Sequence, residues 1–193
     1  MALRQPSTMT VEEYFALEER DPETRYEYID GYVYAMAGGS IDHGTIGGNI
    51  YAILKSLLRG TPCRVFNSDL RVRVSETCYF LPDVTVSCNP ANRGKQQFLE
   101  DPRVVFEVLS PSTEARDRGL KLKYYLACPT IEEYVLVDPN TYRIEIYRKK
   151  KKSWDYTVFE AGEEIEILCL GVHFPIEEAY EDVDFAGEAR SQL

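Results

Sequence analysis

The chain has 193 residues, of which 44% are hydrophobic and 28% charged, a composition typical of one globular domain rather than of a disordered chain. Its apolar runs fall far short of the roughly 20 residues that span a bilayer, and its first residues lack the apolar core of a signal peptide, so we expect a soluble cytoplasmic protein. The net charge of −10 argues against a broad polyanion-binding surface, although Lys149–Lys152 form a local basic run. We expect a single domain over residues 1–193 with loosely ordered termini.

The cysteines are five in number, an odd count without a C-x-x-C pair, and only two histidines could assist them. This pattern excludes a typical structural zinc site. We therefore expect free, buried or half-buried thiols in a reducing compartment.

The first third of the chain predicts a helix and a hairpin. Thr10 and Glu13 have the spacing of a capping box, which predicts a short helix to about Glu19. In residues 25–36, tyrosines then alternate with other residues on either side of Asp30-Gly31, the dipeptide of a type I′ turn. This alternation predicts a β-hairpin.

A second helix follows, because six apolar residues from Ile46 to Leu58 recur at helical spacing until Gly60. His43 lies in its first turn. The glycines near this turn do not form a phosphate loop, since neither a G-x-G-x-x-G order nor a G-K-[ST] ending is present. Strand-like segments come next, at Arg64–Asn67, Leu70–Val74 and Tyr79–Ser87, the last interrupted by Pro82.

The stretch Val104–Leu109 is an apolar run of strand-forming residues, which predicts a strand covered on both faces. Glu107 lies inside it, and a buried carboxylate needs a partner because its desolvation is expensive. The run ends in Ser-Pro-Ser-Thr, where Ser112 or Thr113 is expected to be the N-cap of a helix over residues 114–127.

A further covered strand is predicted at Glu133–Val137, and the order strand, helix, strand indicates a right-handed crossover with parallel pairing. Three more strands, at Tyr142–Tyr147, Trp154–Phe159 and Ile165–Leu168, are expected to continue as an antiparallel series.

Asp83, beside Pro82, and Glu107 lie on or next to strands that would be neighbours. Two carboxylates about 4 Å apart repel by about 4 kcal/mol at an effective dielectric of 20. Either one is protonated or a cation lies between them. Oxygen ligands of this kind suit Mg²⁺ or Mn²⁺.

A lysine near such a metal would orient or deprotonate the attacking water or stabilise charge on a phosphoryl group. Lys121 and Lys123 point about 200° apart on the predicted helix, so only one of them can face the site. Lys121 shares a stripe with Asp117 and Tyr125 at four-residue spacing.

Each of these residues also has an ordinary structural interpretation. Asp83 could be a turn carboxylate, and Lys121 could be a surface partner of Asp117. His43 could be a polar residue at a helix start and Glu27 a hairpin residue. The basic run Lys149–Lys152 could be a solvated hairpin tip.

Taken in order, these motifs resemble the putative restriction endonuclease family of the PD-(D/E)XK nuclease superfamily over about residues 9–185. The resemblance is carried by Tyr26-Glu27-Tyr28-Ile29-Asp30-Gly31, His43, Ser68-Asp69-Leu70-Arg71-Val72, Pro82-Asp83-Val84, Glu107-Val108-Leu109-Ser110-Pro111-Ser112-Thr113, Asp117 to Lys121, Tyr125, Glu133-Tyr134 and Val137-Asp138-Pro139.

The resemblance implies an α/β fold with a restriction-endonuclease-like core, a mixed β-sheet flanked by helices, with an added N-terminal hairpin and C-terminal antiparallel strands. It also implies Mg²⁺- or Mn²⁺-dependent hydrolysis of DNA by a homodimer. Asp83, Glu107 and the carbonyl of Val108 would be the metal ligands and Lys121 the catalytic lysine, with Glu27 and His43 nearby.

The sequence departs from the superfamily pattern at Leu109, where a lysine is expected. Two other functions stay open. One is a nuclease-fold module that binds DNA or takes part in assembly with weak or no catalysis, and the other is a metal-dependent hydrolase of a smaller phosphate ester.

Overall fold

The computed structural model describes residues 8–36, 38–94 and 97–185. Its helical segments are α1 (Val11–Arg20), α2 (Ile41–Leu57), α3 (Glu114–Arg116), a π-helical turn (Asp117–Lys121), α4 (Leu122–Ala127), a 3₁₀ turn (Leu168–Leu170) and α5 (Ile176–Ala179). Its strands are β1 (Tyr26–Ile29), β2 (Tyr32–Ala35), β3 (Arg64–Asn67), β4 (Val72–Ser75), β5 (Cys78–Phe80), β6 (Val84–Ser87), β7 (Val104–Val108), β8 (Glu133–Val137), β9 (Arg143–Lys149), β10 (Trp154–Glu160), β11 (Glu164–Ile167) and β12 (Val172–Pro175).

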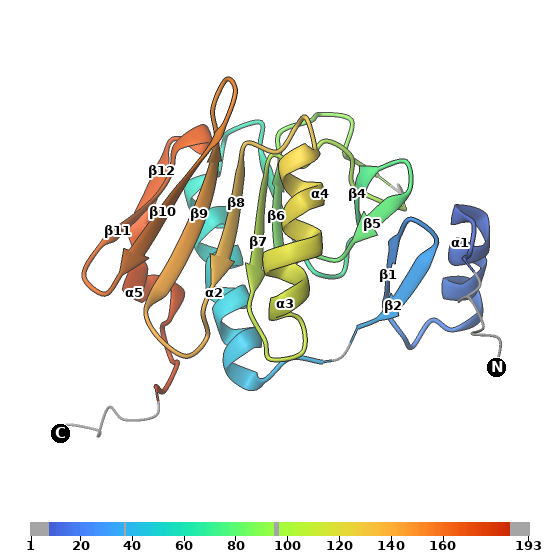
Figure 1. Ribbon diagram of the computed structural model, residues 1–193. Coiled ribbons are helices and arrows are strands. Elements are labelled where there is room, and N and C mark those ends of the chain that lie inside the picture. The colour runs from blue at the N-terminus through green and yellow to red at the C-terminus, as the bar shows by residue number, and fades with distance from the viewer. Residues whose placement is uncertain (1–7, 37, 95–96, 186–193) are drawn as a thin grey trace.

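A six-stranded mixed sheet in the order β10-β9-β8-β7-β6-β3 forms the centre of the fold (Figure 1). Only β7 and β8 pair in parallel, as the strand, helix, strand order predicts, and the other neighbours are antiparallel. Helix α2 covers one face of this sheet, and the segment from α3 to α4 covers the other. The expected mixed sheet flanked by helices is confirmed.

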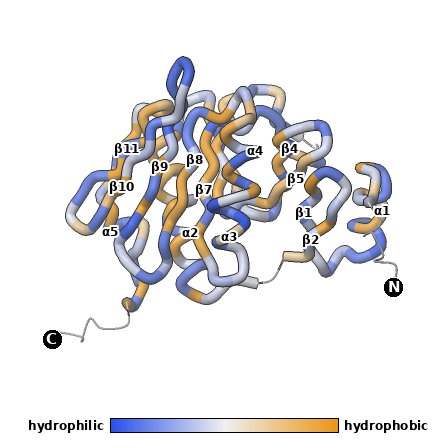
Figure 2. Tube along the Cα trace, in the orientation of Figure 1, coloured by the Kyte–Doolittle hydropathy of each residue, from blue (hydrophilic) through white to orange (hydrophobic). Residues whose placement is uncertain are grey.

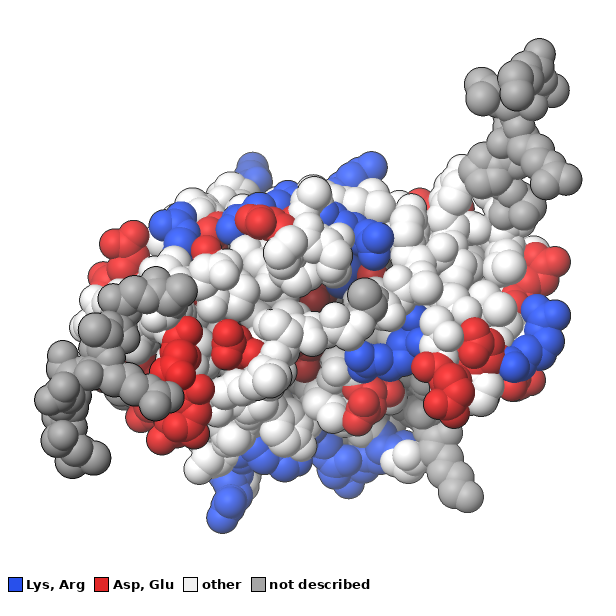
Figure 3. All heavy atoms as spheres, turned by 90° about the horizontal axis from the view of Figure 1, so that it is seen from below, with Lys and Arg blue, Asp and Glu red and all other residues white. Residues whose placement is uncertain are grey.

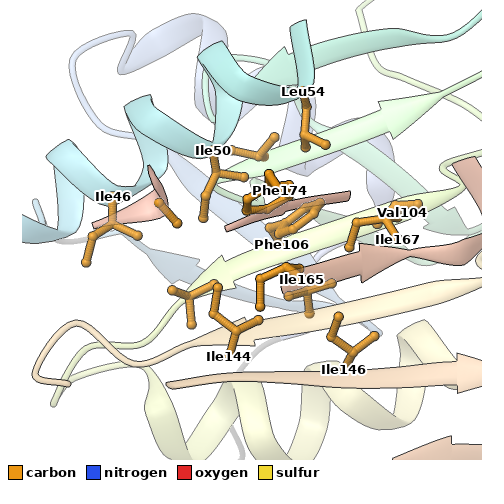
Figure 4. Close-up of a cluster of buried hydrophobic side chains, with 14 of the residues drawn as sticks. Ile46, Ile50, Leu54, Val104, Phe106, Ile144, Ile146, Ile165, Ile167 and Phe174 are labelled. Atoms are coloured by element: carbon orange, nitrogen blue, oxygen red, sulfur yellow. The ribbon is translucent and has the colours of Figure 1, made fainter. Parts of the chain in front are cut away.

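The two faces are buried because the residues of β7 alternate between them. Val104, Phe106 and Val108 face α2, where they meet Ile46, Ile50 and Leu54 (Figure 4). Val105 packs on the opposite face, in the second apolar cluster, to which α4 contributes Tyr125. Hydropathy is accordingly highest along the central strands (Figure 2). Glu107 has the parity of Val105, so its carboxylate is directed to the helix that carries Lys121.

The predicted capping box and hairpin are both confirmed. Thr10 accepts a hydrogen bond from the Glu13 amide, and the Glu13 carboxylate accepts one from the Thr10 amide. Asp30 and Gly31 have φ values of 46° and 92°, as a type I′ turn requires. The hairpin joins a second, four-stranded sheet in the order β2-β1-β5-β4. The predicted strand at 79–87 is thus divided at Pro82, with β5 in one sheet and β6 in the other.

The helix after β7 differs from prediction in two ways. Thr113 makes no side-chain capping bond to the helix. Its hydroxyl lies 2.9 Å from that of Ser110 instead, because residues 110–113 form a turn of their own. The predicted α-helix over 114–127 also contains the π-helical turn Asp117–Lys121.

This π-helical turn is tied to the sheet by a buried carboxylate on β9. Glu145 accepts two hydrogen bonds from Arg118, at 2.8 and 3.0 Å, one from Arg143 at 3.0 Å and one from Tyr156 at 2.8 Å. Burial alone would raise the pKa of Glu145, but these bonds outweigh it and lower the pKa to about 2. The ion pair between Arg118 and Glu145 therefore holds the π-helical turn against β9 at neutral pH.

Two further expectations are wrong. The predicted strand at 165–168 does not continue the β9–β10 series, because β11 pairs with β12 in a separate two-stranded sheet that packs on the α2 face. Cys63 and Cys88 are not free thiols but form a disulfide. Cys63 directly precedes Arg64 and Cys88 directly follows Ser87, and these two neighbours are paired between β3 and β6, a register that the sequence could not supply.

Residues 1–7 and 186–193, which belong to the termini expected to be loosely ordered, lie outside the described residues. No helix within the described ranges is long and apolar enough to cross a membrane.

Candidate active site

Asp83 lies in the short link by which the chain passes from one sheet to the other. Its carboxylate oxygen Oδ2 accepts a hydrogen bond of 2.7 Å from the backbone amide of Val108, the last residue of β7. The next amide, that of Leu109, donates to Val137 on β8. Because successive residues of a strand point their amides to opposite edges, the amide and the carbonyl of Val108 both face the β6 side, where Asp83 lies.

Glu107 is one residue earlier on β7 and is almost fully buried, with 3% of its surface exposed. Its oxygen Oε1 accepts hydrogen bonds from Lys121 at 3.0 Å and from the hydroxyl of Tyr125 at 2.7 Å. The partner that a carboxylate in an apolar strand requires is thus supplied by the helix on the same face. The sequence did not predict that Tyr125 donates a hydrogen bond to Glu107. The four-residue spacing of Tyr125 from Lys121 on the same helix face was the pattern that could have indicated it.

Lys121 is 1% exposed and lies between three carboxylates. Its Nζ atom is 2.7 Å from Glu27, 3.0 Å from Glu107 and 3.3 Å from Asp117. The interpretation of Lys121 and Asp117 as a surface pair is therefore wrong. Lys123 is exposed, so the expectation that Lys121 is the lysine facing Glu107 is confirmed.

The charges of the cluster depend on one another. Burial raises the pKa of Glu107 well above its ordinary value, while the Lys121 ammonium opposes the shift and Asp117 and Asp83 add to it. Burial also raises the pKa of Asp83, against the opposing effects of His43 and the Val108 amide. Burial disfavours the charged form of Lys121, but Glu107, Glu27 and Asp117 outweigh this effect and raise its pKa. Lys121 is thus an ammonium and can donate hydrogen bonds but not accept a proton.

His43 approaches the site from the first turn of α2, where Ser40 caps the helix. Its Nε2 atom lies 3.5 Å from Oδ2 of Asp83. A Cβ atom added at Gly39 would lie 2.7 Å from Nδ1 of His43, so only glycine leaves the ring where it is. The imidazole is therefore packed beside Asp83 by its own helix and by the segment before it.

A cavity of about 100 Å³ opens at this end of the sheet. Asp83, Glu107, Val108, Lys121 and His43 line it, together with Arg25, Met36, Gly38, Gly39, Ser68, Leu81, Ser110, Ser112 and Thr113. On the corresponding face of the molecule, acidic atoms lie at the bottom of a hollow, and Lys and Arg atoms lie on either side of it (Figure 3). Arg25, which the sequence did not single out, donates to the carbonyl and the hydroxyl of Ser68 at 3.2 Å.

The carboxylate oxygens of Asp83 and Glu107 fit a cation that keeps several of its bound waters. The hydrogen bonds described above engage one oxygen of each carboxylate, Oδ2 of Asp83 and Oε1 of Glu107, and both residues face the cavity. Among the described residues, no group of three or more histidines, cysteines or carboxylates is arranged to hold a metal ion. A closed zinc-type site is thus a poor match, whereas Mg²⁺ is typically held by one or two carboxylates plus water and substrate.

The basic run Lys149–Lys152 is not near this site. It forms the tip between β9 and β10, at the end of the sheet marked by Glu133 on β8, whereas Val108 is level with Val137 at the other end (Figure 1). Lys149 donates to two backbone carbonyls, and Lys150 pairs with Asp155 at 3.3 Å. The prediction of a solvated hairpin tip agrees with this placement.

Comparison with known proteins gives a consistent result. The model of the Uma2 family, described as "Putative restriction endonuclease", matches residues 11–177. Two uncharacterized proteins of Synechocystis sp. strain PCC 6803 are similar over most of their length. Protein slr1290 is 37% identical over 179 residues, 92% of this chain and 94% of its own, and protein sll1609 is 31% identical over 171 residues, 86% of this chain and 96% of its own.

The fold is also shared with a solved structure. The crystal structure of a putative nuclease belonging to DUF820, from Anabaena variabilis ATCC 29413, matches with a TM-score of 0.72 and 21% identity over 89% of this chain and 97% of that chain. At this identity the likeness concerns the fold.

Proposed function

Because the chain belongs to the Uma2 family of putative restriction endonucleases and has a restriction-endonuclease-like fold, we propose that it is a metal-dependent nuclease that hydrolyses phosphodiester bonds of DNA. The observation that carries this proposal is the convergence of Asp83, Glu107 and Lys121 on one small cavity. Two carboxylates and an ammonium at the carboxyl end of a central strand are the groups that phosphodiester hydrolysis needs.

Each residue has a proposed role. Asp83, Glu107 and the carbonyl of Val108 would hold Mg²⁺ or Mn²⁺, which would supply a Lewis acid and lower the pKa of a bound water. Lys121 donates hydrogen bonds and stabilises negative charge on the phosphoryl group. Its raised pKa argues against the alternative that Lys121 deprotonates the water. The hydrogen bond from Tyr125 keeps the Glu107 carboxylate in place, and the imidazole of His43 lies beside the Asp83 carboxylate.

We favour DNA as the substrate because, although the chain as a whole is acidic, Lys and Arg atoms lie on either side of the hollow in Figure 3. Arg25 lines the cavity, and Arg116 stacks on Tyr34 at 4.4 Å, with 25% of its side chain exposed and its guanidinium 3.7 Å from the Glu27 carboxylate. Guanidinium groups in such positions bind phosphates. We also propose that residues 1–193 act as one domain and that two copies associate, since cutting both strands of a duplex requires two sites.

The test is the incubation of the purified protein with circular and linear DNA in Mg²⁺ or Mn²⁺, beside Asp83→Asn and Glu107→Gln. We expect cleavage by the wild type only, together with loss of Mn²⁺ binding in both variants. Both replacements remove a buried negative charge of raised pKa, so thermal stability at neutral pH should be unchanged or higher. Equal cleavage by all three proteins would indicate a contaminating nuclease, and unaltered Mn²⁺ binding would exclude these ligands.

The same experiment separates the other two functions. Salt-dependent DNA binding without cleavage would favour a binding module. Hydrolysis of a small phosphate ester with little dependence on salt would favour a small-ester hydrolase.

A further inference from the structure

Glu27 does not line the cavity, yet it is the carboxylate nearest to the ammonium of Lys121. It lies on β1, in the N-terminal hairpin and outside the six-stranded sheet, and is 0% exposed. A buried carboxylate on an appended hairpin is costly unless it is paired. Its position therefore calls for an explanation in terms of its contacts.

One oxygen of Glu27 makes two contacts that lead to the candidate active site. Oε1 lies 2.7 Å from Nζ of Lys121 and accepts a hydrogen bond of 3.1 Å from the backbone amide of Leu81. Leu81 is two residues before Asp83, in the link between the sheets. The same atom thus contacts the lysine and the chain segment that carries one of the two proposed metal ligands.

We propose that Glu27 is a positioning residue for the nuclease reaction. It holds the Lys121 ammonium and the Leu81–Asp83 segment in fixed positions relative to each other. This inference rests on the proposed function. Glu27 acts through Lys121 and does not itself line the cavity, and its other oxygen, Oε2, lies 3.7 Å from the guanidinium of Arg116.

The physical reason is the flexibility of lysine. A lysine side chain can adopt many rotamers, and its ammonium turns freely. Glu107 and Asp117 lie at 3.0 and 3.3 Å from Nζ, farther than Glu27. Without the charge of Glu27, the ammonium would be held only by Glu107 and Asp117 and would leave the position from which it can reach a phosphoryl group. Glu27 thus supplies the contact that fixes the position of the ammonium, which also donates a hydrogen bond to Glu107.

The test compares Glu27→Gln with Glu18→Gln. The glutamine at 27 retains an acceptor for the Leu81 amide but removes the charge that attracts Lys121. Glu18 is a matched control because it is a half-buried carboxylate of the same N-terminal region, paired with Arg71 at 2.6 Å, and lies on α1, on the far side of the β1–β2 hairpin from α3 and α4 (Figure 1). We expect Glu27→Gln to lower kcat about 10- to 100-fold, the size expected for a group misplaced by about 1 Å, with KM for DNA and the Mn²⁺ dissociation constant changed less than about threefold. Glu18→Gln should leave all three constants within about twofold of wild type.

A double variant separates positioning from a general structural role. If Glu27 acts through Lys121, adding Glu27→Gln to Lys121→Met should lower kcat by less than about twofold beyond Lys121→Met alone. The proposal is overturned if Glu27→Gln leaves kcat unchanged, or if its effect multiplies with that of Lys121→Met.

If the wild type cleaves no DNA, the proposed function fails and Glu27 is tested through thermal unfolding of the same variants. If the melting-temperature shift of the double variant differs from the sum of the shifts of the two single variants, Glu27 and Lys121 act as one unit. Additive shifts would overturn it.

Discussion

Replacement of Lys121 by methionine tests the central electrostatic feature of the fold. Methionine has a similar length and no charge, so Lys121→Met removes the ammonium with little change in packing. Glu27, Glu107 and Asp117 are then left buried around an apolar group.

The magnitude follows from the distances. At 2.7 Å, a pair of unit charges attracts by about 6 kcal/mol at an effective dielectric of 20. Desolvation and repulsion between the carboxylates offset much of this attraction, and removing one partner of a buried ion pair typically costs about 3–5 kcal/mol. In a chain of this length, about 1 kcal/mol lowers Tm by about 2–4 °C, so Tm should fall by roughly 10 °C.

The assay is urea unfolding at several pH values, with Lys123→Met as the control on the same helix. Loss of the ammonium removes the effect that opposes the raised pKa of Glu107, so this pKa lies still further above the unfolded value near 4.5. A group with a raised pKa contributes stability below its unfolded pKa and loses it as pH rises. The deficit of Lys121→Met should thus be small near pH 4 and largest near pH 8, and cleavage should fall by about 10²–10⁴-fold.

A deficit below about 1 kcal/mol at pH 8, equal to that of Lys123→Met, would refute this reasoning. It would mean that the Lys121 ammonium gives the buried carboxylates around it no net stabilisation in the wild type.

Three other predictions concern separate parts of the molecule. Because the pKa of Glu145 is lowered from 4.5 to about 2, its charge stabilises the protein above pH 4.5 and this contribution, about 3 kcal/mol, is lost as pH falls to 2; Glu145→Gln should abolish that part of the acid dependence, and an unchanged dependence would contradict the assignment. Gly39→Ala should shift the NMR signals of the His43 ring and leave those of the other histidine unaltered, because the added Cβ would lie 2.7 Å from Nδ1. Lys151 and Lys152 are exposed at the far end of the sheet, so changing both to Gln should lower the salt slope of DNA binding by at most about 1.8 and leave kcat unchanged; a large fall in kcat would place the tip at the substrate.

The sequence was most informative where local rules decide the structure. The Thr10 capping box, the Asp30-Gly31 turn and the strand Glu133–Val137 follow from short patterns, and the structure has all three. Glu107 was recognisable as a residue in need of a partner, because a carboxylate in an apolar strand is costly. Helical geometry allowed only one of Lys121 and Lys123 to face the site, and the stripe with Asp117 and Tyr125, together with the family resemblance, selected Lys121.

Features that depend on pairing between distant segments could not be predicted. The pairing of β3 with β6, which brings Cys63 to Cys88, has no local signal. Likewise, no local pattern around Glu27 indicates that it contacts Lys121, 94 positions later in a chain of 193, and only the family resemblance placed Glu27 near the site. The division of the strand at Pro82 was visible as a break, but not as a passage between two sheets.

The π-helical turn Asp117–Lys121 has a consequence for insertions and deletions. A wider turn places Lys121 and Tyr125 on the same oxygen of Glu107 while Asp117 still reaches the ammonium. Removing one residue from this turn would restore ordinary α-helical winding and rotate everything before it by about 100° relative to α4. A related chain that lacks this extra residue could keep every side chain of the cluster in its sequence and still be unable to assemble it, so alignment gaps here carry as much information as substitutions.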